Sequence, residues 1–172
     1  KLSSSPNDSL LATVYSNNLS MKTAIMKIPD NIFNDPEEKE VLEFENIEVI
    51  AEVESHQQEI KTTEFHSTNN DLIAIVIESK LLLLNRTEAK TQVVAEVNVK
   101  NGGKLAGGKW FNSYQFIVMH ENGLKTYDTR DTNNLAFEIP NAHIQPVRDL
   151  DVNSNKPFTL ATVGDDSALK IW

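Results

Sequence analysis

The chain has 172 residues, 40% of them hydrophobic, and its 25 acidic and 16 basic residues leave a formal net charge of −9. Enough apolar residues are present to build a core, which excludes a wholly disordered chain. The acidic balance repels phosphate and anionic lipid, so we expect neither nucleic acid nor a membrane surface as a partner. The sequence contains no cysteine, which excludes disulfides, a thiol nucleophile and cysteine-ligated zinc and favours a cytoplasmic protein.

The most apolar stretch, Leu72 to Leu84, is interrupted by a polar segment at 78–80. It is shorter than the roughly 18 residues that a membrane-spanning helix needs, so we expect no direct membrane insertion. Residues 1–8 lack the apolar core of a secretion signal and contain no initiator methionine. We therefore expect the chain to be part of a longer protein.

Short apolar segments of four to eight residues, bounded by Asn, Asp, Ser or Gly, recur through the chain. They are rich in Val, Ile, Leu, Phe and Thr, a pattern typical of strands joined by turns, so the expected fold class is all-β. In chain order we expect strands at 10–16, 23–28, 49–54, 60–66, 72–77, 80–85, 93–99, 108–111, 115–119, 124–127, 136–139, 147–152, 159–163 and 169–172.

Bulky residues recur in these strands at a nearly constant spacing. Leu84, Tyr127 and Trp172 are 43 and 45 residues apart, and a carboxylate lies six positions before each of them. Repeats of this length, with four strands each, are typical of the blades of a β-propeller. A second series, which closes the preceding strands, is spaced by 45 and 42 residues and consists of Phe65, Trp110 and Val152.

The period divides the chain into blade-sized units. Because a closed propeller commonly contains more blades than fit here, we expect a propeller fragment of about three to four four-stranded blades. The expected division is an incomplete first blade over 1–29, an acidic loop insertion over 30–46, degenerate repeats over 47–90 and 91–135, and a well-kept repeat, truncated at its end, over 136–172.

In the last repeat, Asn-Ala-His at 141–143 precedes one strand, another strand ends in Gly-Asp-Asp at 164–166, and Leu-Lys-Ile-Trp follows at 169–172. This order resembles a WD repeat. The resemblance implies a tetrad in which the imidazole joins a carboxylate to a hydroxyl and the indole N–H donates to that hydroxyl. Satisfying these buried groups together costs less than burying any one of them alone. The implied tetrad consists of His143, Thr162, Asp166 and Trp172.

The earlier repeats keep less of this pattern. His56, Glu78 and Leu84 stand at the histidine, acid and aromatic positions of the middle repeat, so an apolar residue replaces the tryptophan there. Tyr127-Asp128 keeps the aromatic-aspartate pair of the next repeat, without a histidine ahead of it. These repeats are therefore interpreted as degenerate copies of the last one.

Two patterns that suggest chemistry are better explained as turns. Residues 103–109 match the start of a phosphate-binding loop, but Trp110 replaces the magnesium-binding Ser or Thr, and a strand follows where a helix is needed. Adjacent carboxylates at Asp165 and Asp166 point in different directions and lack a third ligand beside them. We expect no catalytic residue, metal or cofactor, and we expect His66 and His120 at the surface.

Three other residues are candidate partner contacts. The Tyr-Asp-Thr-Arg sequence that ends at Arg130 resembles a motif by which some WD proteins dock to the adaptor of a cullin-type ubiquitin ligase; the alternative is an arginine paired with a neighbouring blade. Arg148 and Asp149 open a strand near one rim of the propeller, where loops collect ligands. A structural ion pair is an equally good explanation for them.

The run Asn-Ala-His-Ile-Gln-Pro-Val-Arg-Asp-Leu-Asp-Val-Asn at 141–153, with weaker stretches at 10–13, 108–110 and 127–130, resembles the EARP and GARP complex-interacting protein family, also called the tumor-suppressing subtransferable candidate family. Leu84 and Tyr127 depart from better-kept WD pairs, as in a divergent member. The resemblance implies a cytoplasmic adaptor, recruited to the trans-Golgi network and endosomes. It would bind the EARP and GARP tethering complexes of endosomal recycling and of endosome-to-Golgi retrograde transport.

The residues alone indicate a rigid, acidic, non-catalytic β-propeller scaffold that holds protein partners on its rims. Two other function classes stay open. A substrate receptor of a cullin-type ligase is suggested by Arg130, and a histone-binding propeller is suggested by the negative charge, which attracts basic tails.

Overall fold

The computed structural model describes residues 2–6, 8–16, 20–29, 47–55, 58–87, 90–98 and 103–172. The acidic loop expected at 30–46 lies outside them. The described residues form 15 strands in antiparallel sheets and no helix, so the expected all-β class is confirmed. Accordingly, this part of the chain contains no helix that is long and apolar enough to cross a bilayer.

Each sheet is built from strands that are consecutive in the chain. The first contains β1 (Leu2–Ser4), β2 (Leu10–Ser16), β3 (Met21–Lys27) and β4 (Glu48–Glu54). The second contains β5 (Ile60–Phe65), β6 (Leu72–Ile77), β7 (Lys80–Arg86) and β8 (Thr91–Asn98). The third contains β9 (Leu105–Trp110), β10 (Gln115–His120), β11 (Gly123–Asp128) and β12 (Asp131–Ile139). The fourth contains β13 (Val147–Val152), β14 (Leu160–Gly164) and β15 (Leu169–Ile171).

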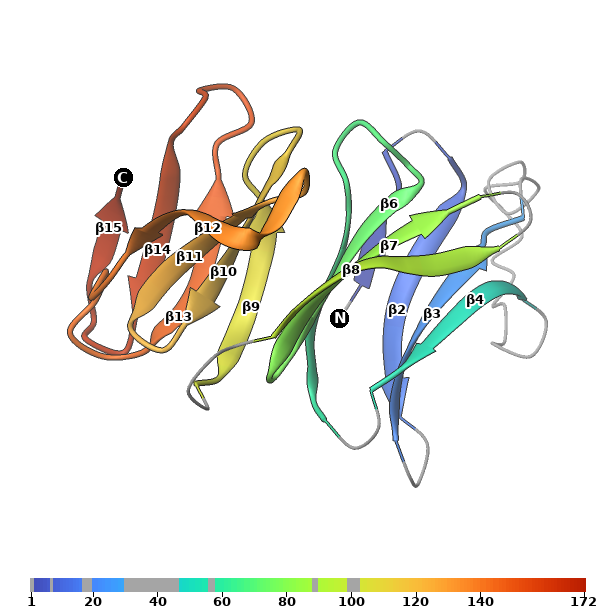
Figure 1. The fold of residues 1–172 in the computed structure, drawn as a ribbon, viewed down its shortest axis with the longest axis horizontal. Coiled ribbons are helices and arrows are strands. Elements are labelled where there is room, and N and C mark those ends of the chain that lie inside the picture. The colour runs from blue at the N-terminus through green and yellow to red at the C-terminus, as the bar shows by residue number, and fades with distance from the viewer. Residues whose placement is uncertain are drawn as a thin grey trace, which may run out of the picture.

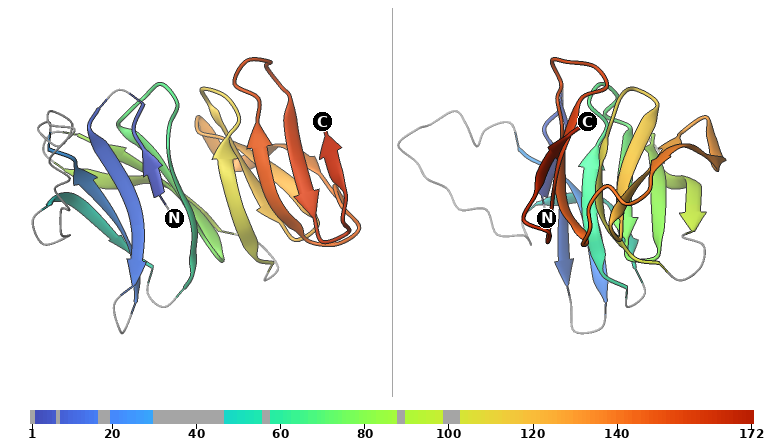
Figure 2. Two further views of the ribbon diagram at one scale, coloured as in Figure 1. Left: turned by 180° about the vertical axis from the view of Figure 1, so that it is seen from behind. Right: turned by 90° about the vertical axis from the view of Figure 1, so that its left-hand side faces the viewer.

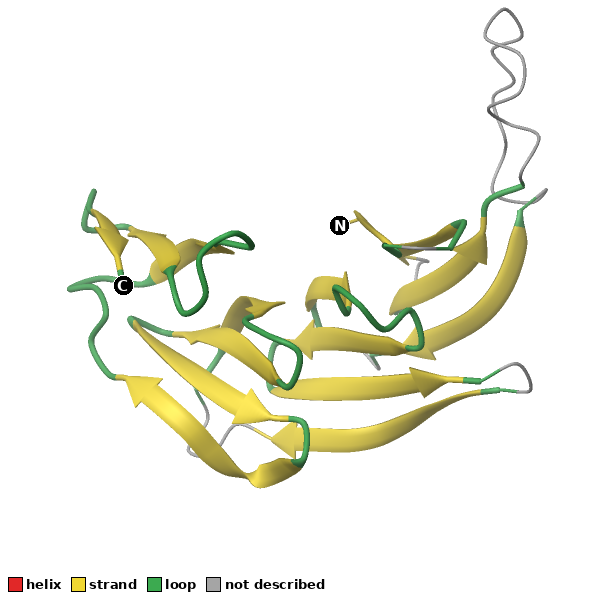
Figure 3. Ribbon diagram, turned by 90° about the horizontal axis from the view of Figure 1, so that it is seen from above, coloured by secondary structure: helices red, strands yellow, loops and turns green. Residues whose placement is uncertain are grey.

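The sheets stand side by side in chain order (Figure 1), and the view from behind shows the same succession (Figure 2). Seen from above, they follow one another around an arc (Figure 3). The first strands of the sheets, β1, β5, β9 and β13, are neighbours in space. These strands form the inner edge of the arc, and the loops that join strands lie along its two rims.

The core consists of three apolar clusters, one between each pair of consecutive sheets. Strand β6 contributes to two of them, because alternate side chains of a strand point to opposite faces. Its residues 73, 75 and 77 belong to the cluster shared with the first sheet, and residues 74 and 76 belong to the cluster shared with the third. A strand covered on both faces needs no polar residue, which explains the continuous Leu-Ile-Ala-Ile-Val-Ile sequence of β6.

Three strands differ clearly from the pattern expected from the sequence. Strand β12 begins at Asp131 rather than at residue 136, because the polar residues 131–134 give no apolar signal. Strand β1 was not expected, because only Leu2 in it is strongly apolar; it exists through its pairing with residues 11–13 of β2. Strand β9 begins at Leu105 rather than at residue 108, since its glycines weaken the strand signal without preventing pairing with β10.

The sheets are offset from the expected repeat boundaries. Strand β4 follows segment 30–46 in the chain and pairs with β3. The first sheet therefore has four strands over residues 2–54, where an incomplete blade was expected over 1–29. The physical reason is that pairing of β4 completes the sheet across the intervening segment, which the strand pattern of 1–29 alone does not reveal.

Candidate functional site

A chain of hydrogen bonds in the fourth sheet links two loops to two strands. His143 lies between β12 and β13, Thr162 in β14, Asp166 in the turn before β15, and Trp172 directly after β15. His143 Nδ1 lies 2.8 Å from Asp166 Oδ1, and its Nε2 lies 2.8 Å from Thr162 Oγ1. Trp172 Nε1 donates to the same hydroxyl oxygen at 3.0 Å. The structure thus brings together all four residues of the tetrad that the WD resemblance implies.

One protonation pattern satisfies every polar atom in this chain of bonds. With its proton on Nδ1, the imidazole of His143 donates to the carboxylate, and Nε2 accepts the proton of the Thr162 hydroxyl, whose oxygen accepts the indole N–H. His143 and Thr162 are buried, and a buried group without a partner costs about 1–3 kcal/mol. The tetrad therefore holds the loop before β13 and the turn before β15 against the sheet.

The carboxylate of Asp166 also accepts two backbone amides. Ile144 N–H donates to Oδ2 at 2.9 Å, and Ala168 N–H donates to Oδ1 at 3.2 Å. The hydrogen bond from Ile144, with those from His143 and Ala168, lowers the pKa of Asp166 to about 2 against the opposing effect of desolvation. Asp166 is consequently ionised at neutral pH. Its hydrogen bonds hold the loop at Ile144 and the turn at Ala168 in place.

Gly164 allows the histidine to lie this close to β14. A Cβ atom at residue 164 would lie 2.7 Å from the His143 ring and 3.0 Å from Asp166 Oδ1. Any larger residue would push the imidazole away from its partners. The sequence signal for this close approach is the position of the glycine directly before Asp-Asp at 165–166.

The bulky residues that set the period pair with apolar residues in the second strand of their own sheets. In each of the first three sheets, the pairing between the third strand and the outer strand shifts register directly before one residue of the third strand. These residues are Met26, Leu84 and Tyr127. Such a bulge adds one residue to the outer strand, and it places Met26 in the series as well. The paired residues are Leu84 with Ile73, Tyr127 with Phe116 and Trp172 with Leu160.

Apolar residues replace the tetrad threonine in the second and third sheets. Thr162 lies two positions after Leu160, the partner of Trp172. The equivalent positions, two after Ile73 and two after Phe116, hold Ile75 and Val118. Both are fully buried, so these sheets substitute apolar packing for the hydrogen-bonded hydroxyl. His56, expected at the histidine position of the second repeat, lies outside the described residues.

Arg130 lies in the turn between β11 and β12. Its guanidinium donates to both carboxylate oxygens of Asp128, at 2.8 and 2.6 Å, and lies 4.3 Å from the centre of the Tyr114 ring. The side-chain hydrogen bond from Arg130 lowers the pKa of Asp128 to about 2. Arg130 thus pairs within its own sheet rather than with a neighbouring blade, and its side chain stays 65% exposed. The guanidinium is both fixed and accessible.

Arg148 and Asp149 lie at the start of β13. Arg148 Nε donates to Asp165 Oδ1 at 2.6 Å, and its second nitrogen contacts the other carboxylate oxygen. The hydrogen bond from Arg148 lowers the pKa of Asp165. Asp149 accepts the amide of Leu150 at 2.9 Å and has no ion pair within the described ranges. Arg148 therefore belongs to an exposed ion pair, whereas the Asp149 carboxylate has no cation of its own.

The expectation that His66 lies at the surface was wrong. His66 is buried, and its ring packs edge-on against Trp110 with centroids 4.5 Å apart. Nδ1 accepts the amides of Thr68 and Asn69, and Nε2 donates to the Ser113 carbonyl at 3.0 Å. The hydrogen bonds that it supplies to two loops explain why a histidine is tolerated there.

The glycine-rich segment at 103–109 continues into β9 and is followed by no helix. Lys109 Nζ donates to Asp151 at 2.9 Å in the neighbouring sheet. His120, at the end of β10, is partly buried, and this burial lowers its pKa. Throughout the described part of the chain, no group of three or more His, Cys, Asp or Glu side chains is arranged to hold a metal ion.

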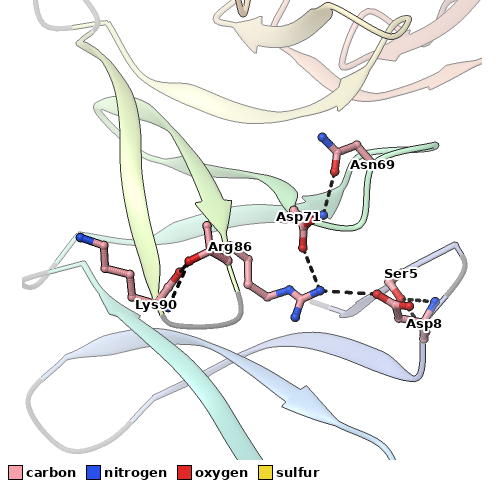
Figure 4. Close-up of polar contacts among 7 residues, drawn as sticks. Ser5, Asp8, Asn69, Asp71, Arg86 and Lys90 are labelled. Atoms are coloured by element: carbon pink, nitrogen blue, oxygen red, sulfur yellow. Dashed lines mark hydrogen bonds and ion pairs between the residues drawn. The ribbon is translucent and has the colours of Figure 1, made fainter.

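An ion-pair cluster that sequence reasoning missed joins the first two sheets (Figure 4). Arg86, at the end of β7, contacts Asp71 at 2.9 Å in its own sheet and Asp8 at 3.5 Å in the loop between β1 and β2. The amide of Asp71 donates to Asn69, and that of Asp8 donates to Ser5. No motif marks this cluster, because residues 8 and 86 meet only through the fold.

The sequence is similar to proteins of one kind in several organisms. It is 36% identical over 107 residues to EARP and GARP complex-interacting protein 1 of Macaca fascicularis and 35% identical over 107 residues to that of Homo sapiens. Both matches cover 58% of this chain and 27% of the relative. Over these 107 residues the chain is a homologue of these proteins. An EARP-interacting protein homolog of Dictyostelium discoideum is 29% identical over 126 residues, covering 71% of this chain and 31% of the relative.

The fold is that of a WD40 propeller. The WD40 domain of Toxoplasma gondii coronin superposes with a TM-score of 0.75 and 16% sequence identity, covering 99% of this chain and 41% of that chain. The propeller architecture and the family resemblance expected from the sequence are thereby confirmed. No protein-family model matches the chain. The chain spans 27% of the length of the first two curated relatives.

Proposed function

We propose that this chain belongs to a non-catalytic interaction scaffold that binds the EARP and GARP complexes. The observation that carries the proposal is the 36% identity over 107 residues to a protein named for its interaction with both complexes. The WD40 fold supports a role in protein interaction, because propeller rims present loops on a rigid frame. The chain spans 27% of that relative, so the proposal concerns the complete protein.

The finer role that we propose is that of an adaptor in endosomal recycling and in endosome-to-Golgi retrograde transport. The protein would act in the cytoplasm and be recruited to the trans-Golgi network and endosomes together with its complexes. Direct insertion into the membrane and binding to nucleic acid are not part of this role. The net charge of −9 supports that restriction, since it repels anionic lipid and phosphate.

We place a partner contact at the rim of the fourth sheet. Ile144 is 87% exposed there, and Asp166 holds its amide in place. Arg148 and Asp149 lie close by in the sequence, at the start of β13. An apolar side chain on a fixed loop beside charged groups suits a protein contact, because little entropy is lost when such a loop binds.

Affinity purification of the tagged full-length protein from cells tests the proposal. We expect subunits of both complexes among the bound proteins, and we expect the double variant Ile144→Ser with Arg148→Ala to recover less of them. Glu96→Gln, an exposed change on β8, is the control that should bind normally. Recovery of neither complex with the wild-type protein would remove the proposal.

A receptor role in a cullin-type ubiquitin ligase is the second candidate, because Arg130 is fixed by Asp128 and Tyr114 yet remains 65% exposed. Arg130→Ala in the full-length protein should then abolish binding to the ligase adaptor while leaving capture of the EARP and GARP complexes intact. An unchanged affinity for the ligase adaptor would end this second candidate.

A further inference from the structure

The first strands of all four sheets line one cavity on the inner side of the arc. The cavity has a volume of about 240 Å³, and its walls include Leu2 of β1, Glu64 of β5, Lys109 of β9 and Asp149 of β13. A second cavity of about 410 Å³ shares Glu64 and Lys109 with the first. The two cavities therefore meet at this pair of residues. We call the two together the axial cavity.

Negative charge is in excess around the axial cavity. The hydrogen bond from Lys109 to Asp151 raises the pKa of Lys109, and the nearby charges of Asp151, Glu64 and Asp149 raise it further. One lysine thus faces three carboxylates. Arg148, which also lines the cavity, forms an ion pair with Asp165 and therefore does not neutralise these carboxylates.

Glu64 is the carboxylate without a partner. Over the described ranges its side chain makes no hydrogen bond or ion pair. Partial burial raises the pKa of Glu64, although the charge of Lys109 opposes this effect. A carboxylate that is partly removed from water without a counter-ion costs free energy.

A second group in the same strand also lacks a partner. Thr63 is 1% exposed and lines the same cavity, and its hydroxyl is buried without a hydrogen-bond partner. Buried polar groups in folded proteins are normally satisfied. Because alternate side chains of a strand point to opposite faces, this buried hydroxyl does not lie beside the Glu64 carboxylate. The unpaired Glu64 carboxylate, which lines the axial cavity, is the group that points to a ligand that the described part of the chain does not supply.

The remaining walls favour a particular kind of ligand. Leu2, Ala106, Met119 and Leu150 give the cavity an apolar part beside the carboxylates. Lysine and arginine side chains combine an aliphatic stem with a cationic end, and they bury the stem while the charge finds a partner. This combination matches the walls better than a small inorganic cation does.

We propose that the axial cavity binds a lysine or arginine side chain from an extended basic segment of a partner protein. Its cationic end pairs with Glu64 and Asp149, and its stem packs against Leu2 and Leu150. The inference rests on the proposed function only in taking the occupant to be a protein segment. It does not depend on which complex supplies that segment.

Fluorescence anisotropy with the full-length protein tests this site. The probe is a short labelled peptide that alternates lysine with serine, and the comparison peptide has every lysine acetylated. We expect the lysine peptide to bind and Glu64→Gln to weaken it by about tenfold or more, equivalent to about 1.4 kcal/mol. Glu138→Gln makes the same charge change on the exposed strand β12 and should leave the affinity unchanged, and the acetylated peptide should not bind.

Two results would overturn the proposal: an affinity unchanged in Glu64→Gln, or an equal loss in Glu138→Gln. If Glu64→Gln folds poorly, Asp149→Asn, which changes an exposed side chain, replaces it as the test variant. Asp149→Asn must then lower the affinity for the lysine peptide, and an unchanged affinity of this variant overturns the proposal. Capture of the EARP and GARP complexes is measured in parallel. If the peptide binds but neither complex is captured, the proposed binding site stands and the proposed adaptor role is rejected. If the complexes are captured but the peptide does not bind, the adaptor role stands and the binding site is rejected.

Discussion

The hydroxyl of Thr162 is the centre of the hydrogen-bond chain in the fourth sheet. It lies between His143 Nε2 and Trp172 Nε1, at 2.8 and 3.0 Å. Gly164 lets the imidazole lie close to β14, within hydrogen-bond distance of this hydroxyl. The tetrad therefore depends on one oxygen atom.

Replacing this oxygen provides the first prediction. Thr162→Val keeps the shape and leaves the imidazole and the indole N–H without a partner, so the free energy of unfolding should fall by about 1–3 kcal/mol. Denaturant unfolding of the full-length protein measures this. Thr159→Val is the matched control, since its hydroxyl makes no hydrogen bond in the described part of the chain. Equal stability of the two variants would contradict the tetrad's role.

The ionised carboxylate of Asp166 should make the stability of the fold depend on pH in the acid range. The folded pKa of Asp166 is about 2, below the value of about 3.9 for an unfolded aspartate. Its stabilising contribution is therefore complete above about pH 4 and is lost as the pH falls toward 2. Asp166→Asn should melt at a temperature that depends less on pH over this range than that of the wild type. Identical acid sensitivity of the two proteins would show that other carboxylates carry the effect.

At the scale of a strand, β9 is notable for how closely it approaches β10. A Cβ atom at Gly108 would lie 2.5 Å from the Ile117 carbonyl oxygen and 2.5 Å from the Phe116 ring. Gly108→Ala should therefore lower the free energy of unfolding by about 1–3 kcal/mol through overpacking. Chemical denaturation measures the loss, with the exposed-loop change Ser154→Ala as control. An unaltered midpoint for Gly108→Ala would mean that β9 moves away at little cost.

Strand positions were largely predictable because each strand except β1 carries its own apolar pattern. Strand β6 is recognisable from six consecutive apolar residues, whereas the Leu-Ser-Ser of β1 becomes a strand only through β2. The tetrad was also predictable, because the order of residues in the last repeat resembles a WD repeat. Glu64 and Arg86 were not, because their surroundings come from other sheets; Arg86 and Asp8 are 78 residues apart in sequence.

At the scale of the molecule, sheets adhere through apolar clusters supplemented by ion pairs such as that of Arg86. Arg86→Met should weaken the contact between the first two sheets by about 0.2–1 kcal/mol, the range for ion pairs at a protein surface. We expect faster amide hydrogen exchange in β2 and β3 of the full-length protein. Lys80→Met removes a pair with Glu96 inside the second sheet and should leave exchange in the first sheet unchanged. Equal exchange in both variants would refute a bridging role.

We propose that the complete protein acts as an interaction scaffold. The most direct test of this proposal is binding between the purified full-length protein and each purified complex, followed by interferometry. We predict saturable binding to both EARP and GARP under conditions in which an unrelated propeller of similar charge does not bind. Absence of binding to either complex, with the propeller shown to be folded, would contradict the account.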